Sequence, residues 1–152
     1  MLLSLPREAY SSWKGGAPVG CDIHAAIEVR EYNEWWTFVA QPSVRRNYEL
    51  FSLLAGVRGE HEPWIPPRGL PDRRTISYDA WHEGNGNYGE GVVDGDHSAS
   101  WFTLEEAQRF RLPECNDSTR TQWNMWLHTM NFFAKLYNVS ADRVRVIFNF
   151  DN

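Results

Sequence analysis

Residues 21–30, which read CDIHAAIEVR, decide how this chain folds. Every second residue from Cys21 onward is small or apolar, and Asp22 and His24 stand between them. Side chains two positions apart on a β-strand project to the same face of the sheet. The alternation therefore predicts a strand with one face in the core and with Asp22 and His24 on the opposite face.

A second stretch, residues 94–98 with the sequence DGDHS, also sets a histidine beside acidic residues and borders an expected strand. Because His24 and His97 both project away from an apolar alternation, we expect them to share one patch with Asp22. Two imidazoles and several carboxylates on one patch can bind a metal, move protons or hold a phosphate-bearing ligand.

Two other segments of the chain predict further strands. A turn at 31–33 and the aromatic and β-branched residues of 34–40 predict a hairpin partner. Near the end of the chain, valine and phenylalanine alternate with mostly polar residues over 144–151, which predicts another strand.

A helix and a long loop follow the expected hairpin. Ser43 can cap a helix over 44–57, which Gly56 and Gly59 end. From residue 60 to residue 95 the chain is rich in proline and glycine. A loop of this length in a compact domain is typical of a binding loop or lid.

Two more helices are expected before the last strand. Thr103 and Glu106 form a capping box for a short helix over 104–111. Apolar residues at i, i+3, i+4 and i+7 predict a long helix over 118–137, which Asn138 can cap. The expected fold is α+β: a small, mostly antiparallel sheet packed on helices, with a long Pro/Gly-rich loop.

The composition is that of one globular domain. The 152 residues are 42% hydrophobic and 14% aromatic, which is enough for a core and argues against disorder. No run approaches the roughly 18 apolar residues of a membrane helix, and the N-terminus is a poor signal peptide. Two cysteines, Cys21 and Cys115, make no disulfide scaffold, so we expect a reduced, cytosolic protein.

The first 18 residues differ from the rest. They have no apolar period and end in turn formers, so we expect an N-terminal extension at 1–18 outside the core and a single domain over 19–152. Lys-Gly-Gly at 14–16 can be encoded by a ribosome-binding-like purine run, and a Val19 codon can be a GUG start. We therefore hypothesise that the natural product begins at Val19.

The charge pattern bears on the partner. A formal net charge of −5 argues against general nucleic-acid coating. The only lysines are Lys14 and Lys135, and six arginines fall between residues 45 and 74. Arginine suits phosphate and stacks on bases, although a GC-rich genome also favours arginine codons.

From Gly20 onward the chain resembles a family of small, uncharacterised phage and bacterial proteins that open with Met-Gly-Cys-Asp-Ile-His. The shared landmarks are GCDIH at 20–24, Glu28, RNYELF at 46–51, RGLP at 68–71, HSASW at 97–101, the Thr103-Leu104 pair and FNFDN at 148–152. The family's usual Asp-Gly-His-Ser reads DGDHS here, so Asp94 or Asp96 takes the aspartate's place. The family's ending has Trp where this chain has Asn149. The resemblance implies a phage context rather than a particular reaction.

Three interpretations of the histidines remain open. The first is structural, with His24 bonded to a carbonyl. The second is a divalent metal such as zinc or manganese, with Asp22, His24, Asp94, Asp96 and His97 as candidate ligands. The third is metal-free catalysis, in which two histidines act as general base and acid and Asp22 orients His24.

Other catalytic motifs are absent from the sequence. Neither Ser98 nor Ser100 sits in a Gly-x-Ser-x-Gly elbow, and no P-loop lysine occurs. Arginines can hold a phosphate and Trp64 can stack on a base. The residues expected to bind the ligand are Arg46, Asn47, Arg58, Arg68, Trp64, Ser98 and Trp101.

These observations favour a cytoplasmic protein of an infected or lysogenic bacterial host, with no membrane association. We expect it to recognise, and to be able to hydrolyse, a phosphate-bearing nucleotide such as an immune-signalling cyclic nucleotide, as a counter-defence factor. As an enzyme it would be a metal-independent or metal-assisted phosphodiesterase. The alternatives are a non-catalytic, homo-oligomeric sponge for the nucleotide and a protein–protein inhibitor of a host factor.

Overall fold

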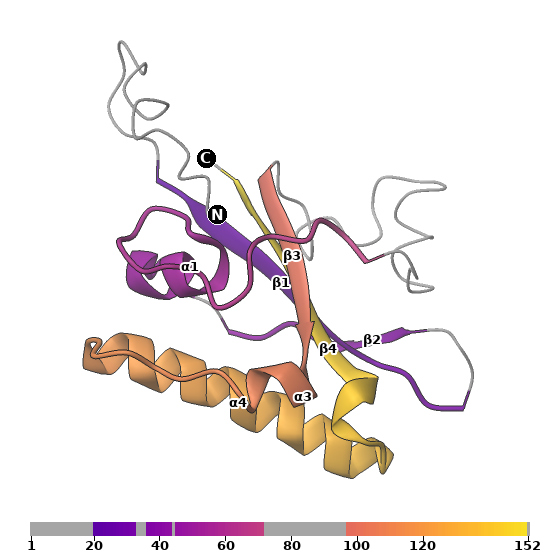
Figure 1. Cartoon of the computed structure of the whole chain (residues 1–152). Helices are drawn as coiled ribbons and strands as arrows, with labels where there is room; N and C mark the ends of the chain where they lie inside the picture. Colours follow the sequence, from indigo (N-terminus) through magenta and orange to yellow (C-terminus); the bar gives the residue numbers. More distant parts are fainter. Residues whose placement is uncertain (1–19, 33–35, 44, 72–96, 152) are drawn as a thin grey trace, which may run out of the picture.

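A computed structural model describes residues 20–32, 36–43, 45–71 and 97–151, and its fold is α+β as the sequence predicts (Figure 1). Four strands form one antiparallel sheet in the order β2-β1-β4-β3. The strands are β1 (Asp22–Val29), β2 (Thr37–Ala40), β3 (His97–Thr103) and β4 (Val144–Asp151). The expected N-terminal extension and most of the expected Pro/Gly-rich loop lie outside the described residues.

The helices pack on one face of this sheet. They are α1 (Tyr48–Ala55), α3 (Leu104–Ala107) and α4 (Asp117–Tyr137), and a 3-10 turn, η3 (Ala141–Arg143), leads into β4. Helix α4 runs along the bottom of Figure 1, and α1 lies above its N-terminal part. None of the helices in the described ranges is both long and apolar enough to cross a membrane.

The pairing of β1 with β4 organises the sheet. All eight residues of each strand are paired, from Asp22 opposite Asp151 to Val29 opposite Val144. The paired apolar positions of both strands face the helices and form the core with residues of α1, α3, α4 and β3. The largest of these fully buried side chains are Trp123, Trp126, Phe51, Phe148, Phe150, Ile27, Leu50, Leu104 and Met130.

The start of α1 differs from the expected one. The helix begins at Tyr48 because Asn47, rather than Ser43, is its N-cap. The Asn47 side chain accepts the backbone N–H of Leu50 at 3.0 Å, which satisfies a donor that the first turn leaves unpaired. The expectation that Ser43 caps a helix over 44–57 is therefore wrong.

Two predicted C-terminal caps and one predicted capping box are confirmed. Gly56 and Asn138 take the left-handed conformation after α1 and α4, with φ of 71° and 51°. Thr103 and Glu106 form the predicted capping box, although α3 ends at Ala107, earlier than residue 111.

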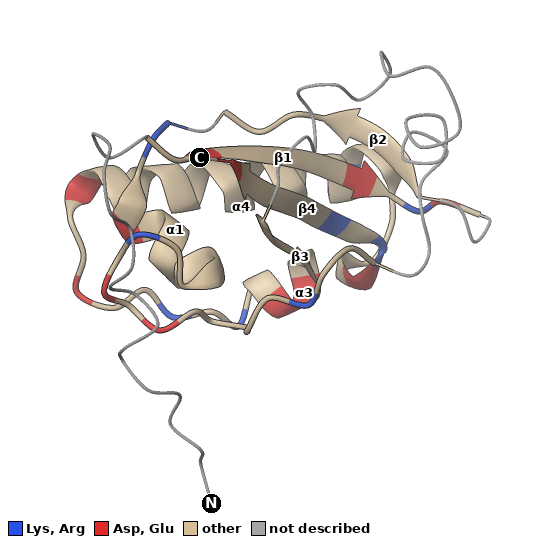
Figure 2. Cartoon of the chain, turned by 90° about the horizontal axis from the view of Figure 1, so that it is seen from above, with Lys and Arg blue, Asp and Glu red and all other residues tan. Residues whose placement is uncertain are grey.

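The face of the sheet opposite the helices, here called the second face, carries the polar alternation of β1 and β4. At one end of it the buried side chains of Glu28 and Arg145 form an ion pair, with 3.2 Å between Oε1 and Nε. Figure 2 shows these acidic and basic positions side by side on β1 and β4. The guanidinium carbon of Arg145 also lies 4.0 Å from the ring centre of Trp36.

Burial dominates the ionisation of this pair. It raises the pKa of Glu28 to about 7, and the attraction of Arg145 only partly opposes it. In an unfolded chain Glu28 ionises at its ordinary value of 4.5. Between the two values the folded state therefore keeps a proton that the unfolded state releases, so this group favours folding at low pH and loses that effect as pH rises through 7.

Glu28→Gln should remove this pH dependence. Between about pH 5 and 8 we expect the wild type to lose stability relative to the variant by on the order of 1–3 kcal/mol. Urea unfolding of both proteins at several pH values measures the difference. Parallel pH profiles for the two proteins would contradict the assignment.

Candidate functional site

The other end of the second face carries a polar cluster that we call the His24 cluster: Asp22, His24, Arg46 and Asp151. Nε2 of His24 lies 2.8 Å from Oδ2 of Asp151, and the backbone N–H of Asp22 donates to Oδ1 of Asp151 at 3.3 Å. A carboxylate only accepts hydrogen bonds, so Nε2 of the neutral ring carries the hydrogen and Nδ1 carries the lone pair. Asp151 therefore orients the imidazole of His24.

Arg46 forms a bidentate ion pair with the carboxylate of Asp22. Its Nε and Nη2 donate to the two oxygens of Asp22, each at 2.8 Å. These hydrogen bonds hold the pKa of Asp22 below its ordinary value of 3.8. The two side chains are each 52% exposed, so a ligand in solution can reach them.

The backbone of Gly20 makes room for this contact. A Cβ atom at Gly20 would stand 2.3 Å from Nη1 of Arg46, so the guanidinium lies directly against the glycine. The backbone N–H of the next residue, Cys21, donates to the hydroxyl of Tyr48 at 3.3 Å. This bond ties the start of β1 to the start of α1, and Arg46 lies just before that helix.

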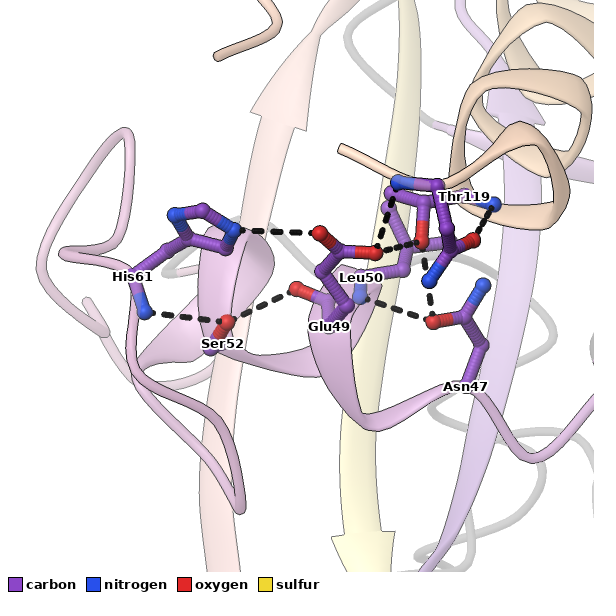
Figure 3. A network of polar contacts seen from close by, with 7 residues as sticks. Asn47, Glu49, Leu50, Ser52, His61 and Thr119 are labelled. Atoms are coloured by element: carbon purple, nitrogen blue, oxygen red, sulfur yellow. Dashed lines mark hydrogen bonds and ion pairs between the residues drawn. The ribbon is translucent and has the colours of Figure 1, made fainter. Parts of the chain in front are cut away.

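A network of hydrogen bonds fixes the first turn of α1 on α4 (Figure 3). Glu49 accepts from the hydroxyl of Thr119 at 2.8 Å and from the N–H of Asn116 at 3.1 Å, and Nε2 of His61 lies 3.3 Å away. Although burial raises the pKa of Glu49, these hydrogen bonds lower it below 4.5. The Thr119 hydroxyl also lies 3.2 Å from Oδ1 of Asn47. Asn47, which the sequence analysis expects to bind ligand, therefore lies between α1 and α4 as a structural residue.

His97 does not lie with His24, and the expectation of a shared patch is wrong. His97 is opposite Phe150 in the sheet and stacks on its ring, with 5.9 Å between ring centres. Phe150 faces the helices and is fully buried, whereas His24 is opposite Asn149 on the second face. Because the two histidines lie on opposite faces of the sheet, they cannot act together as base and acid, and they cannot share a metal ion.

An irregularity in β3 explains the change of face. Between the paired positions His97–Phe150 and Ser100–Phe148, β3 has one more residue than β4. Ser98 within this stretch has a left-handed φ of 54°. Such a bulge reverses the alternation, so the side chain of His97 points to the helix side of the sheet. In an uninterrupted strand His97 would lie on the second face, as Trp101 does.

The predicted arginines do not converge on the His24 cluster. Arg68 forms an ion pair with Glu106 at 2.9 Å, and its guanidinium carbon lies 4.3 Å from the ring centre of Trp101 on β3. Strand β3 is separated from β1 by β4, so Arg68 lies away from the cluster. Burial raises the pKa of the Cys21 thiol, and Arg58 lies close enough to Cys21 to lower that pKa by a smaller amount. Of the arginines expected to bind ligand, Arg46 alone belongs to the cluster.

Two more predicted ligand-binding residues have structural partners. Trp64 stacks on Phe110 with ring centres 5.0 Å apart, and its indole N–H donates to the carbonyl of Arg111 at 3.0 Å. The hydroxyl of Ser98 lies 3.0 Å from Nδ1 of His97. Neither residue is part of the His24 cluster.

In the described part of the chain, no three His, Cys, Asp or Glu side chains are arranged to hold a metal ion. Asp94 and Asp96 lie outside the described residues. Both oxygens of Asp22 are engaged by Arg46.

Asp151 is the residue that the sequence-based assignment missed. It stands at an outward position of the alternation in β4, so its face was predictable. Its contact with His24 depends on which strand pairs with β1 and in which register, and neither follows from local sequence.

Comparisons of the chain with protein-family models, with curated proteins and with solved structures find no match.

Gly20→Ala should push Arg46 away from Asp22 without unfolding the protein, because the clash is with the end of a flexible side chain. The pKa of Asp22 should then rise toward 3.8. A carboxyl-carbon NMR titration measures it, and Arg46→Gln should give a similar rise. An unchanged pKa of Asp22 in Gly20→Ala would show that Arg46 does not depend on this glycine.

Proposed function

We propose that the protein binds a phosphate-bearing nucleotide at the His24 cluster and that His24 is the proton-transfer group there. The observation that carries the proposal is an imidazole held by Asp151 at 2.8 Å, two residues along β1 from an exposed arginine–carboxylate pair. Oriented imidazole and guanidinium groups are the protein groups that phosphate-ester chemistry uses most directly.

Arg46 would bind the phosphate by exchanging partners. Its present partner, Asp22, is a carboxylate, and a phosphate offers the guanidinium the same bidentate geometry. An ion pair that is half exposed contributes only about 0–1 kcal/mol, so a phosphate can replace Asp22 at small cost.

In the hydrolytic form of this proposal, Nδ1 of His24 takes a proton from water as the water oxygen attacks phosphorus. Asp151 stabilises the imidazolium that forms, and Arg46 stabilises the charge on the phosphate oxygens. The leaving oxygen takes its proton from solvent.

A second candidate is a sponge that binds the nucleotide without cleaving it. It is favoured by the position of His97 on the opposite face, since His97 then cannot serve as the second proton-transfer group. The phage context that the sequence resemblance implies makes immune-signalling cyclic nucleotides the first ligands to test for both candidates.

Calorimetric titration with a panel of cyclic and ADP-ribose-type nucleotides tests the binding site. Arg46→Ala should weaken binding roughly tenfold to a hundredfold, as expected for loss of a charge-assisted bidentate contact. Asp22→Asn should strengthen it several-fold, because Arg46 then has no competing carboxylate. Arg45→Ala, the neighbouring exposed arginine, is the matched control and should change little.

Failure of every nucleotide to bind wild type better than about millimolar would reject the nucleotide site. So would equal losses in Arg46→Ala and Arg45→Ala. In either case the protein-inhibitor alternative becomes the first to test.

His24→Ala separates the two candidates. If the protein hydrolyses its ligand, a substoichiometric amount of wild type should convert it, and His24→Ala should lose turnover by about 10²-fold or more but keep binding. His128→Ala, an exposed histidine on α4, serves as control. A sponge would instead act stoichiometrically in all three proteins and release intact ligand on heating.

A further inference from the structure

Helix α4 carries an exposed apolar stripe that neither the core nor the His24 cluster uses. Met125, Phe132 and Leu136 are 48%, 58% and 62% exposed. At about 100° per residue, these three positions lie within about 20° of one line along the helix. Single exposed apolar residues are ordinary, but three large ones on one line are typical of a contact surface.

The stripe has two unlike halves. Its C-terminal half is a ridge formed by Phe132 and Leu136. Its N-terminal half borders a hollow of about 340 Å³, which is lined by Ser43, Arg45, Asp117, Ser118, Thr121, Gln122 and Met125. Between them, the hydroxyl of Thr129 donates to the carbonyl of Met125 at 2.7 Å, so it needs no further acceptor when covered.

We propose that a second copy of this chain covers the stripe, with its α4 antiparallel to the first. A two-fold axis across the helix between residues 128 and 129 places Met125 opposite Phe132 of the second copy. The same axis sets Leu136 of the second copy opposite Thr121, over the hollow. The ridge of each copy thus meets the hollow of the other, which is the self-complementarity that a two-fold interface needs.

The side chains in these positions suit one another. Met125 would contact the ring of Phe132, which is a favourable sulfur–aromatic pair. Arg45 in the hollow can lie over the same ring as a cation–π partner. The antiparallel arrangement also sets the positive N-terminus of one helix beside the negative C-terminus of the other. A contact of one helix per copy is small, so we expect a weak, reversible dimer.

Sedimentation equilibrium of the full chain tests the proposal over protein concentrations from about 1 to 300 µM. Wild type should dimerise in this range, and Phe132→Glu should raise the dimer dissociation constant at least tenfold. Asn124→Glu adds the same charge on the same helix about 100° from the stripe and should change it less than about twofold. A wild type that stays monomeric overturns the proposal, as does an equal effect of the two variants.

Cross-linking tests the antiparallel arrangement in a Cys115→Ser background. Thr129→Cys lies at the proposed axis and should cross-link to its own copy with a short bismaleimide. Ser118→Cys also lies on the stripe, but its two copies should be about 30 Å apart along the helices and should not react. Cross-linking at 118 but not at 129 would contradict the antiparallel dimer. Both experiments are independent of nucleotide binding.

Discussion

The register between β1 and β4 is the constraint on which the rest of this structure depends. It pairs eight residues of each strand and aligns two alternations of the same period, so every apolar position of one strand lies beside an apolar position of the other. The same register brings Asp22 to Asp151 and Glu28 to Arg145 on the second face. A slip of one residue would turn the phenylalanines of β4 to the second face and Asp151 into the core. The β1–β4 register therefore determines both the packing of the hydrophobic core and the positions of the residues in the His24 cluster.

The Glu28–Arg145 pair and the Asp22–Arg46 pair have opposite energetic characters. Glu28 and Arg145 are both almost fully removed from solvent, so each side chain loses hydration. This loss raises the pKa of Glu28 and lowers the pKa of Arg145, which favours the neutral form of each. Asp22 and Arg46 are half exposed and keep much of their hydration. The buried pair is fixed because breaking it would leave a charge without compensation. The exposed pair can change partners, which is the property that a binding site for an anion requires.

Much of the fold could be predicted from local sequence. The alternation in residues 21–30 and 144–151 gave both central strands, and Gly56, Asn138 and the Thr103–Glu106 capping box marked helix ends correctly. The start of α1 was misplaced because Ser43 and Asn47 are both good caps, and Asn47 is selected by its contact with Thr119 on α4. The site was only half predictable. His24 and Asp22 were found, but Asp151 reaches them through strand pairing, and one extra residue near Ser98 turned His97 to the other face.

The tautomer of His24 tests the central claim most directly, namely that the β1–β4 register places Asp151 on Nε2. Long-range proton–nitrogen NMR correlations at alkaline pH, where the ring is neutral, distinguish the two nitrogens. The structure predicts the Nε2–H tautomer in wild type, and in Asp151→Asn it predicts loss of that preference because an amide can also donate. An Nδ1–H tautomer in wild type, or a mixture that Asp151→Asn leaves unchanged, would contradict the account.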